Sequence, residues 1–280
     1  MRFALEELTC GYRGKRVLSD ISISVRTGDC LCVLGCNGVG KTTLFKSILG
    51  LLPLIEGRVT VDGREMQGLP ARERARLIGY VPQAHVPPFP YTVLDIVVMG
   101  RVAHQGMFAS PGKQDVEIAR QTLDSLGILH LADCVYTQIS GGERQMALIA
   151  RALTQQPAVL LMDEPTANLD FANQARVLER VCRLTGQGVI VVMTSHSPDH
   201  ALRCDAKVLL LEREGGHSFG TAQEMIRPEK LNRAYGVPVC ITEGRYRNHV
   251  VRGCVPLIDA DVKPDASDND RTDQRKEETL

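Results

Sequence analysis

The sequence has no apolar run long enough to cross a membrane. Uninterrupted apolar stretches such as Val189–Met193 and Val159–Met162 are far shorter than the roughly 18 residues that a membrane helix needs. The first residues, Met1–Glu7, include two glutamates where a signal peptide would carry its apolar segment. We therefore expect neither a membrane span nor an export signal, and we expect a soluble, cytosolic chain.

The sequence also lacks a surplus of charges of either sign, and it lacks closely paired cysteines. Lysine and arginine together number 33, as do aspartate and glutamate, so the basic excess of nucleic-acid-binding proteins is absent and we expect no nucleic-acid partner. The nine cysteines include no C-x-x-C pair, which favours separate thiols in a reducing compartment over disulfides or a zinc site. Nor does any segment of about 20–50 residues repeat.

Strand-like and helical segments alternate along the chain. Helical periodicity is predicted for Gln114–Gly127 and Glu143–Leu153, with short helices near Thr221–Ile226 and Pro228–Tyr235. Seven short apolar segments have strand character: Ile21–Val25, Cys30–Leu34, Val59–Val61, Ile78–Val81, Val159–Met162, Val189–Thr194 and Lys207–Leu211.

This order predicts an α/β nucleotide-binding core interrupted by a mostly helical insert. We place the core at about residues 1–82 and 154–226, the insert at about 83–153, and the end of the domain at 258. Residues 259–280 are rich in charged and polar side chains and nearly free of apolar ones. We predict that this charged tail is disordered.

The most informative motif is a phosphate loop of the form G-x-x-x-x-G-K-[ST], Gly35-Cys36-Asn37-Gly38-Val39-Gly40-Lys41-Thr42. An apolar strand precedes it and helical spacing from Thr43 follows it, which is the context that the motif requires. Its glycines allow backbone N–H groups to point at phosphate oxygens. Lys41 supplies charge for the β- and γ-phosphates, and the Thr42 hydroxyl is placed to ligate Mg²⁺. The alternative is a glycine-rich turn with an incidental lysine.

A second motif is the apolar strand Val159–Met162, which ends in Asp163 and Glu164. An acid at the carboxyl end of a buried strand is where α/β sheets hold Mg²⁺ against a nucleotide. We expect Asp163 to hold the ion through its water shell and Glu164 to act as general base on the attacking water. The alternative is a strand followed by an ordinary acidic loop.

A third motif lies just upstream, Ser140-Gly141-Gly142-Glu143. Locally it is a capping box that opens a helix over Arg144–Leu153, and a capped helix start with two glycines is also an anion site. Together with the two nucleotide motifs it resembles the signature sequence of ABC-transporter ATPases. Two departures are Ile139 in place of the usual leucine and Glu143 in place of the frequent glutamine.

The resemblance covers about Leu5 to Gly236 and implies a fold and an activity. The implied fold is a RecA-like P-loop core with an antiparallel β subdomain and a helical signature subdomain, over residues 1–258. The implied activity is ATP hydrolysis with Mg²⁺ as cofactor. Cys36 stands where the family usually has proline or arginine, and we weigh a thiol-sensitive phosphate loop against a tolerated small residue.

The resemblance also assigns further residues. Tyr12 would stack on adenine, Gln83 would reach Mg²⁺ and the water site, Asp170 matches the aspartate after the second motif, and His196 would contact the γ-phosphate. In the implied mechanism, Ser140, Gly141, Gly142 and Glu143 cap the ATP of a second subunit, so a homodimer is expected. Transmembrane permease subunits and, indirectly, an extracytoplasmic binding protein are the other expected partners. The expected location is the cytoplasmic face of the cell membrane.

Several segments are similar to the importer branch for iron–siderophore complexes, haem and cobalamin: Tyr91–Arg101, Gly142–Gln145, Ile149–Leu153, Leu169–Gln174 and Leu231–Gly236. Molybdate and tungstate importers look similar, and an exporter subunit and a non-transport ABC ATPase are the remaining alternatives. The region Gln83–Arg101 is expected to receive permease helices. The apolar residues near it belong either to that contact or to the core: Phe89, Tyr91, Met107 and Phe108.

Overall fold

The computed structural model describes residues 1–12, 14–83, 89–106 and 110–258, and a six-stranded sheet forms their centre. Its five neighbouring strands from β9 to β6 are parallel, and β10 pairs antiparallel with β9 at the edge. The order across the sheet is β10 (His217–Thr221), β9 (Lys207–Leu211), β3 (Cys30–Leu34), β8 (Ile190–Ser195), β7 (Val159–Met162), β6 (Ile78–Val81).

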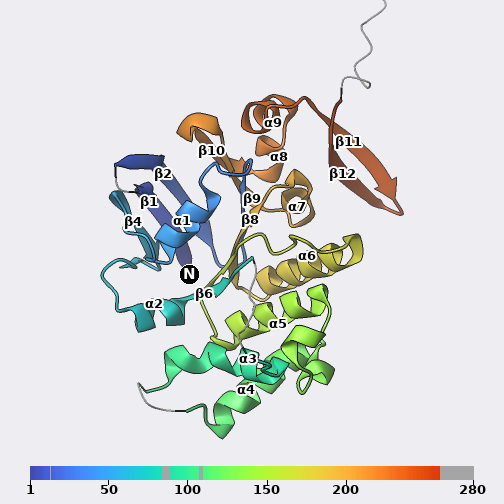
Figure 1. The fold of residues 1–280 in the computed structure, drawn as a ribbon. Coiled ribbons are helices and arrows are strands. Elements are labelled where there is room, and N and C mark those ends of the chain that lie inside the picture. Colours follow the sequence, from blue (N-terminus) through green and yellow to red (C-terminus); the bar gives the residue numbers. More distant parts are fainter. Residues whose placement is uncertain (13, 84–88, 107–109, 259–280) are drawn as a thin grey trace, which may run out of the picture.

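Both faces of this sheet are buried, because successive side chains of a strand point to opposite faces. In β3, Leu31 and Val33 join one apolar cluster, whereas Cys32 and Leu34 join another on the far side. The first cluster includes α1 (Lys41–Ile48) and an antiparallel sheet. The second is built with helices, so the central sheet is the middle layer of the molecule (Figure 1).

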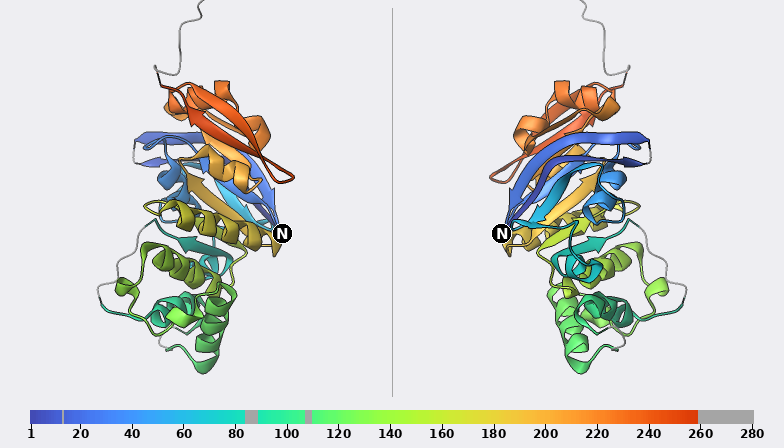
Figure 2. Two further views of the ribbon diagram at one scale, coloured as in Figure 1. Left: turned by 90° about the vertical axis from the view of Figure 1, so that its right-hand side faces the viewer. Right: turned by 90° about the vertical axis from the view of Figure 1, so that its left-hand side faces the viewer.

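The antiparallel sheet forms the outer layer on one side. Its strand order is β2-β1-β4-β5, and α1 lies between it and the central sheet (Figures 1 and 2). A short helix, α2 (Ala71–Leu77), leads from it into β6. The four strands are β1 (Arg2–Tyr12), β2 (Lys15–Arg26), β4 (Glu56–Val61) and β5 (Arg64–Glu65).

Helices gather at one end of the molecule, beyond β6 (Figure 2). Tyr136 is fully buried among them. The elements are α3 (Val93–Val98), the 3₁₀ segments η1 (Met99–His104), η2 (Leu129–Leu131) and η3 (Tyr136–Gln138), α4 (Lys113–Ser125) and α5 (Gly141–Thr154).

The C-terminal third supplies helices to the second face and ends in a hairpin. The hairpin projects beside α7 and α9, and the Cys254 N–H donates to Asp199 on α7 at 2.8 Å (Figure 1). The elements are α6 (Phe171–Gly186), α7 (Pro198–Arg203), η4 (Arg213–Gly215), α8 (Ala222–Met225), α9 (Pro228–Tyr235), β11 (Val239–Tyr246) and β12 (His249–Pro256).

The predicted fold class is confirmed, with some differences in detail. The strands β3, β6, β7 and β9 have the predicted bounds, but β1 and the terminal hairpin were not expected from the sequence. The helix α5 begins at Gly141 rather than Arg144, because the helix starts directly after its cap at Ser140. The proposed domain boundaries stay a prediction. Met107, Phe108 and the tail from residue 259 lie outside the described residues.

None of the helices in the described parts of the chain is both long enough and apolar enough to cross a membrane.

A buried ion pair ties the helical end together. The Arg101 guanidinium donates to Asp115 at 3.0 Å and to the carbonyl of Thr154 on α5 at 3.0 Å. The Arg101 side chain is 9% exposed. This guanidinium and the Gly112 N–H hold the pKa of the Asp115 carboxyl below its usual range.

We predict that Arg101→Ala lowers the free energy of unfolding by about 3 kcal/mol, because it leaves a half-buried carboxylate without its partner. Arg120→Ala is the matched control, since Arg120 pairs with Asp133 at 3.9 Å on the surface and should cost under about 1 kcal/mol. Urea unfolding measures both. The contribution of Asp115 should be present above about pH 4 and fade as the pH falls through its lowered pKa. Equal losses in the two variants would contradict the prediction.

Candidate functional site

The phosphate loop joins β3 to α1, and its backbone requires glycine. Gly35, Gly38 and Gly40 have φ angles of 150°, 79° and 118°, in the region that other residues rarely adopt. A Cβ on Gly35 would lie 2.8 Å from the carbonyl oxygen of Leu211 on β9. The loop can therefore wrap closely and turn its N–H groups inward, as a phosphate site needs.

Lys41, the first residue of α1, is the centre of the site. Lys41 is only 6% exposed. Its Nζ donates to the carbonyl oxygens of Gly35 at 2.7 Å and Cys36 at 3.3 Å. The same Nζ lies 3.7 Å from Oε1 of Glu164. One ammonium group thus connects the phosphate loop with the acid that follows β7.

The two acids after β7 are held by the neighbouring strand β8. The Thr194 hydroxyl donates to Oδ1 of Asp163 at 2.7 Å and accepts from the Glu164 N–H at 2.8 Å. Glu164 has φ 46°, an unusual value for a residue other than glycine. Burial raises the pKa of the Asp163 carboxyl above its usual range, and the hydrogen bond from Thr194 partly opposes this.

Gln83 completes this cluster from a third strand end. It follows β6 closely, and its Nε2 donates to Oε2 of Glu164 at 3.0 Å. His196 is exposed and directly follows β8, a strand of the same parallel sheet. The structure therefore brings both Lys41 and Gln83 to the carboxylate of Glu164, although the three residues are far apart in the sequence.

A second histidine, His200 on α7, was not expected from the sequence. Its Nδ1 lies 2.9 Å from the Ser195 hydroxyl and 3.5 Å from the Thr166 hydroxyl, and the residue is 8% exposed. Burial lowers its pKa to about 4, so the ring is neutral at neutral pH. Through Ser195 and Thr166, His200 links the turn that carries His196 to the turn that follows Glu164.

The signature residues lie at the start of α5, beside the start of α6. The Ser140 hydroxyl accepts from the Glu143 N–H at 3.3 Å, and the Glu143 carboxylate accepts from the Ser140 N–H at 2.8 Å, a complete capping box. Asp170 caps α6 by accepting from the Asn173 N–H at 2.8 Å. None of the hydrogen bonds or ion pairs among the described residues links these two turns to Lys41 or Glu164.

Tyr12 ends β1 and is 51% exposed. With Leu52, Pro53 and Leu54 it lines an open hollow of about 730 Å³. An exposed ring over an apolar surface suits a planar base, and the predicted contact of Tyr12 with adenine stays a prediction.

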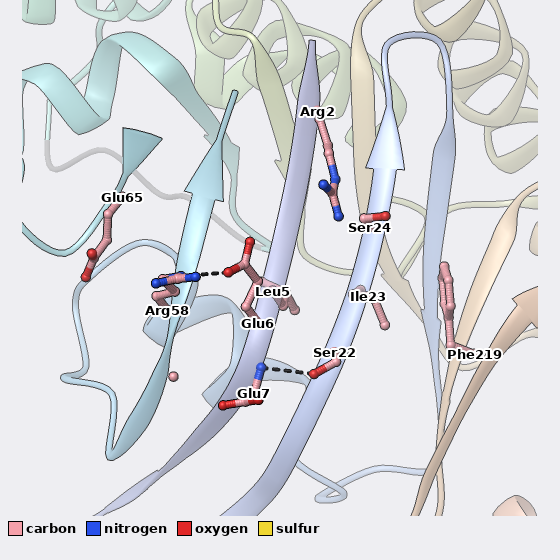
Figure 3. A pocket seen from close by; sticks show the side chains of 11 residues that line it. Arg2, Leu5, Glu6, Glu7, Ser22, Ile23, Ser24, Arg58, Glu65 and Phe219 are labelled. Atoms are coloured by element: carbon pink, nitrogen blue, oxygen red, sulfur yellow. Dashed lines mark hydrogen bonds and ion pairs between the residues drawn. The ribbon is translucent and has the colours of Figure 1, made fainter. Parts of the chain in front are cut away.

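Another hollow of about 730 Å³ lies on the outer face of the antiparallel sheet (Figure 3). Its opposite charges pair with one another, as in the Arg58–Glu6 contact at 2.6 Å. It includes no residue of the phosphate loop or of the acid pair. This hollow is therefore separate from the candidate site.

The donor set suits Mg²⁺ bound together with phosphates. Magnesium usually keeps several waters and takes only one or two carboxylates besides the phosphate oxygens. The exposed Thr42 hydroxyl, the Asp163 carboxylate and the Gln83 amide are such a sparse set. Accordingly, no cluster of three or more His, Cys, Asp or Glu side chains among the described residues could hold a metal by itself.

Comparison with known proteins places this site in a family. The family model for ABC transporters matches residues 18–167. The chain belongs to the ABC transporter family. A molybdate import ATP-binding protein of Haemophilus influenzae is 36% identical over 91% of this chain and 96% of that protein. A hemin import ATP-binding protein of Pseudomonas entomophila is 37% identical over 83% of this chain and 92% of that protein.

A solved chain from an ABC transporter assigned to the metal-chelate type superimposes with a TM-score of 0.84. It is 35% identical, and the match covers 93% of this chain and 99% of that one. The present chain is therefore an ATP-binding ATPase subunit of the ABC transporter family. Thr194 and His200 belong to none of the sequence motifs. Both lie near the end of β8, which His196 follows.

We predict that Thr194→Val lowers both the ATP turnover of this ABC ATPase and its free energy of unfolding. The unfolding free energy should fall by about 1–2 kcal/mol, because the Glu164 N–H loses its acceptor and Asp163 loses a donor. The exposed Thr137→Val is the control and should change stability by less than about 0.5 kcal/mol. Urea unfolding and phosphate release measure the two effects, and wild-type turnover in Thr194→Val would refute the anchoring role.

Proposed function

We propose that this chain hydrolyses MgATP and that two copies, closing on ATP, power the import of a metal chelate through a membrane permease. The observation that carries the proposal is the contact of Lys41, Gln83 and Glu164 at the carboxyl ends of the parallel strands. Lys41 lies 3.7 Å and Gln83 3.0 Å from oxygens of the Glu164 carboxylate. This is the place where α/β sheets bind nucleotides.

Each residue of this cluster has a distinct task. Lys41 binds the β- and γ-phosphates, and the N–H groups of the phosphate loop surround them. Glu164 accepts the proton of the attacking water, and Gln83 orients its carboxylate. His196 contacts the γ-phosphate. Magnesium, held by Thr42, Asp163 and Gln83, would supply positive charge for the phosphate oxygens.

The site on one chain is incomplete for this reaction. Ser140 and Gly142 lie at the start of α5, and among the described residues no hydrogen bond or ion pair joins them to the Lys41 cluster. A second copy would therefore bring its own Ser140 and Gly142 to the γ-phosphate. Hydrogen bonds to a charged group are worth about 1.5–3 kcal/mol each, so closure of the two copies strongly favours turnover.

A groove beside the helical end suits a permease helix. It has a volume of about 430 Å³ and is lined by residues of α1, α2, η1 and α5 and the segments beside them. Leu51 is 71% and Met99 38% exposed there, and both would be buried by a docked apolar side chain. We infer that permease subunits bind here, which holds the chain at the cytoplasmic face of the membrane. Of the two other apolar residues considered from the sequence, Phe89 is 62% exposed, whereas Tyr91 packs against the core.

The identity of the cargo is the most specific part of the proposal. The hemin relative and the metal-chelate structure support a metal chelate, delivered to the permease by an extracytoplasmic binding protein. The molybdate relative, 36% identical over 91% of the chain, supports an oxyanion as the second candidate.

We predict that Lys41→Ala abolishes MgATP binding, whereas Glu164→Gln keeps binding and stops turnover. The first change removes the phosphate-binding charge, and the second removes the base while preserving its shape and the contact with Gln83. Nucleotide binding and phosphate release by the purified chain measure both effects. Near-normal hydrolysis by Glu164→Gln would remove Glu164 from the role of base.

The cargo prediction is tested by uptake in a strain that lacks the gene. Labelled hemin, ferric siderophore, cobalamin and molybdate are supplied in parallel, and uptake of one metal chelate should disappear. The wild-type gene should restore it, and the Lys41→Ala gene should not. Loss of molybdate uptake alone would favour the oxyanion, and unchanged uptake of all four would refute both cargoes.

A further inference from the structure

Asn173 lies where the starts of α5 and α6 meet, between the signature turn and the turn of Asp170. A Cβ built on Gly142 would lie 2.5 Å from both Cγ and Oδ1 of Asn173 and 2.8 Å from its Nδ2. The amide of Asn173 thus rests directly on the backbone of Gly142. At Gly141, by contrast, a Cβ would meet nothing closer than Leu169 at 3.9 Å.

The Asn173 amide is held in this position by neighbours on α6. Its Nδ2 donates to Oδ2 of Asp170 at 2.8 Å, and its Oδ1 accepts from Arg176 at 3.3 Å. The Asn173 N–H also donates to Asp170 Oδ1 at 2.8 Å. A larger residue at position 142 would have to break these bonds to push the amide aside. Because the two groups are closely packed, a shift of the Gly142 backbone would also shift the Asn173 amide and the Asp170 turn bonded to it.

We propose that Asn173 is a positioning residue that joins the signature turn to the Asp170 turn, so that both meet the ATP of a second copy in one fixed arrangement. The inference rests on the proposed two-copy ATPase mechanism. The side chain of Asn173 leaves no room for a Cβ at position 142, so a requirement for glycine there arises within one chain and does not need the nucleotide.

The test is a pair of single variants and their combination in the full chain. Gly142→Ala should lower ATP turnover about 100-fold and Asn173→Ala about tenfold, because displaced groups lose their alignment with the reacting phosphate. In Gly142→Ala/Asn173→Ala the added methyl group has room, so turnover should recover to the level of Asn173→Ala alone. The change should appear in kcat, with MgATP binding by isolated subunits as in the wild type and a cooperative urea unfolding transition retained.

Asn232 on α9 provides the control, since it is an exposed asparagine on a helix away from Gly142. Asn232→Ala should keep wild-type turnover and should not rescue Gly142→Ala. A double variant as slow as Gly142→Ala would overturn the inference, as would loss of MgATP binding in Asn173→Ala. Ser140→Ala separates failure of the two-copy mechanism from failure of the Asn173 inference. Unchanged turnover in Ser140→Ala would overturn the two-copy mechanism. Slowed turnover in Ser140→Ala, together with no recovery in Gly142→Ala/Asn173→Ala, would overturn only the role of Asn173.

Discussion

The site depends on one buried ammonium group. Lys41 is almost fully enclosed, and a buried charge is tolerated only where it is paired and hydrogen-bonded. The carbonyl oxygens of Gly35 and Cys36 and the carboxylate of Glu164 provide those partners. Because the partners come from two strand ends, Lys41 links the phosphate loop with the acid. In the proposed function, phosphate oxygens of ATP would accept hydrogen bonds from the same ammonium group.

The parallel sheet makes this pairing possible. Pairing of Leu34 with Ser195 and of Val81 with Met162 brings the ends of β3, β8, β7 and β6 to one edge. Lys41, His196, Glu164 and Gln83 follow these four strands in that order. Each strand is buried on both faces, so its register cannot slip without exposing apolar side chains. The precision of the site thus comes from the core.

The starts of α5 and α6 form a second unit, with a different physical basis. Here the constraint is steric, because Gly142 and Asn173 occupy space that no further carbon atom can share. The unit carries Ser140 and Asp170, and within the described part of the chain no hydrogen bond or ion pair joins it to the Lys41 cluster. In the proposed mechanism, a second copy of the chain would bring the two units together around one ATP.

Much of the fold was predictable from local sequence. The apolar runs at Cys30–Leu34 and Val159–Met162 and the capping box at Ser140 can be recognised from a few consecutive residues, and the structure has them as predicted. The strand β1 was missed because its side chains do not alternate cleanly: register shifts interrupt its pairing with β2. The hairpin of β11 and β12 was missed because most of its residues are exposed, so burial leaves little pattern in the sequence.

By itself the sequence determined which groups are candidates for the site: a glycine-rich phosphate loop, a lysine, a strand-end acid pair and a capped helix start. Only the tertiary structure decided which of these groups touch. The bond of Gln83 to Glu164, the anchoring of both acids by Thr194, the bracing by His200 and the contact of Asn173 with Gly142 join residues from different elements. Such contacts depend on strand order and helix packing, which are set by burial over the whole chain and by no local motif.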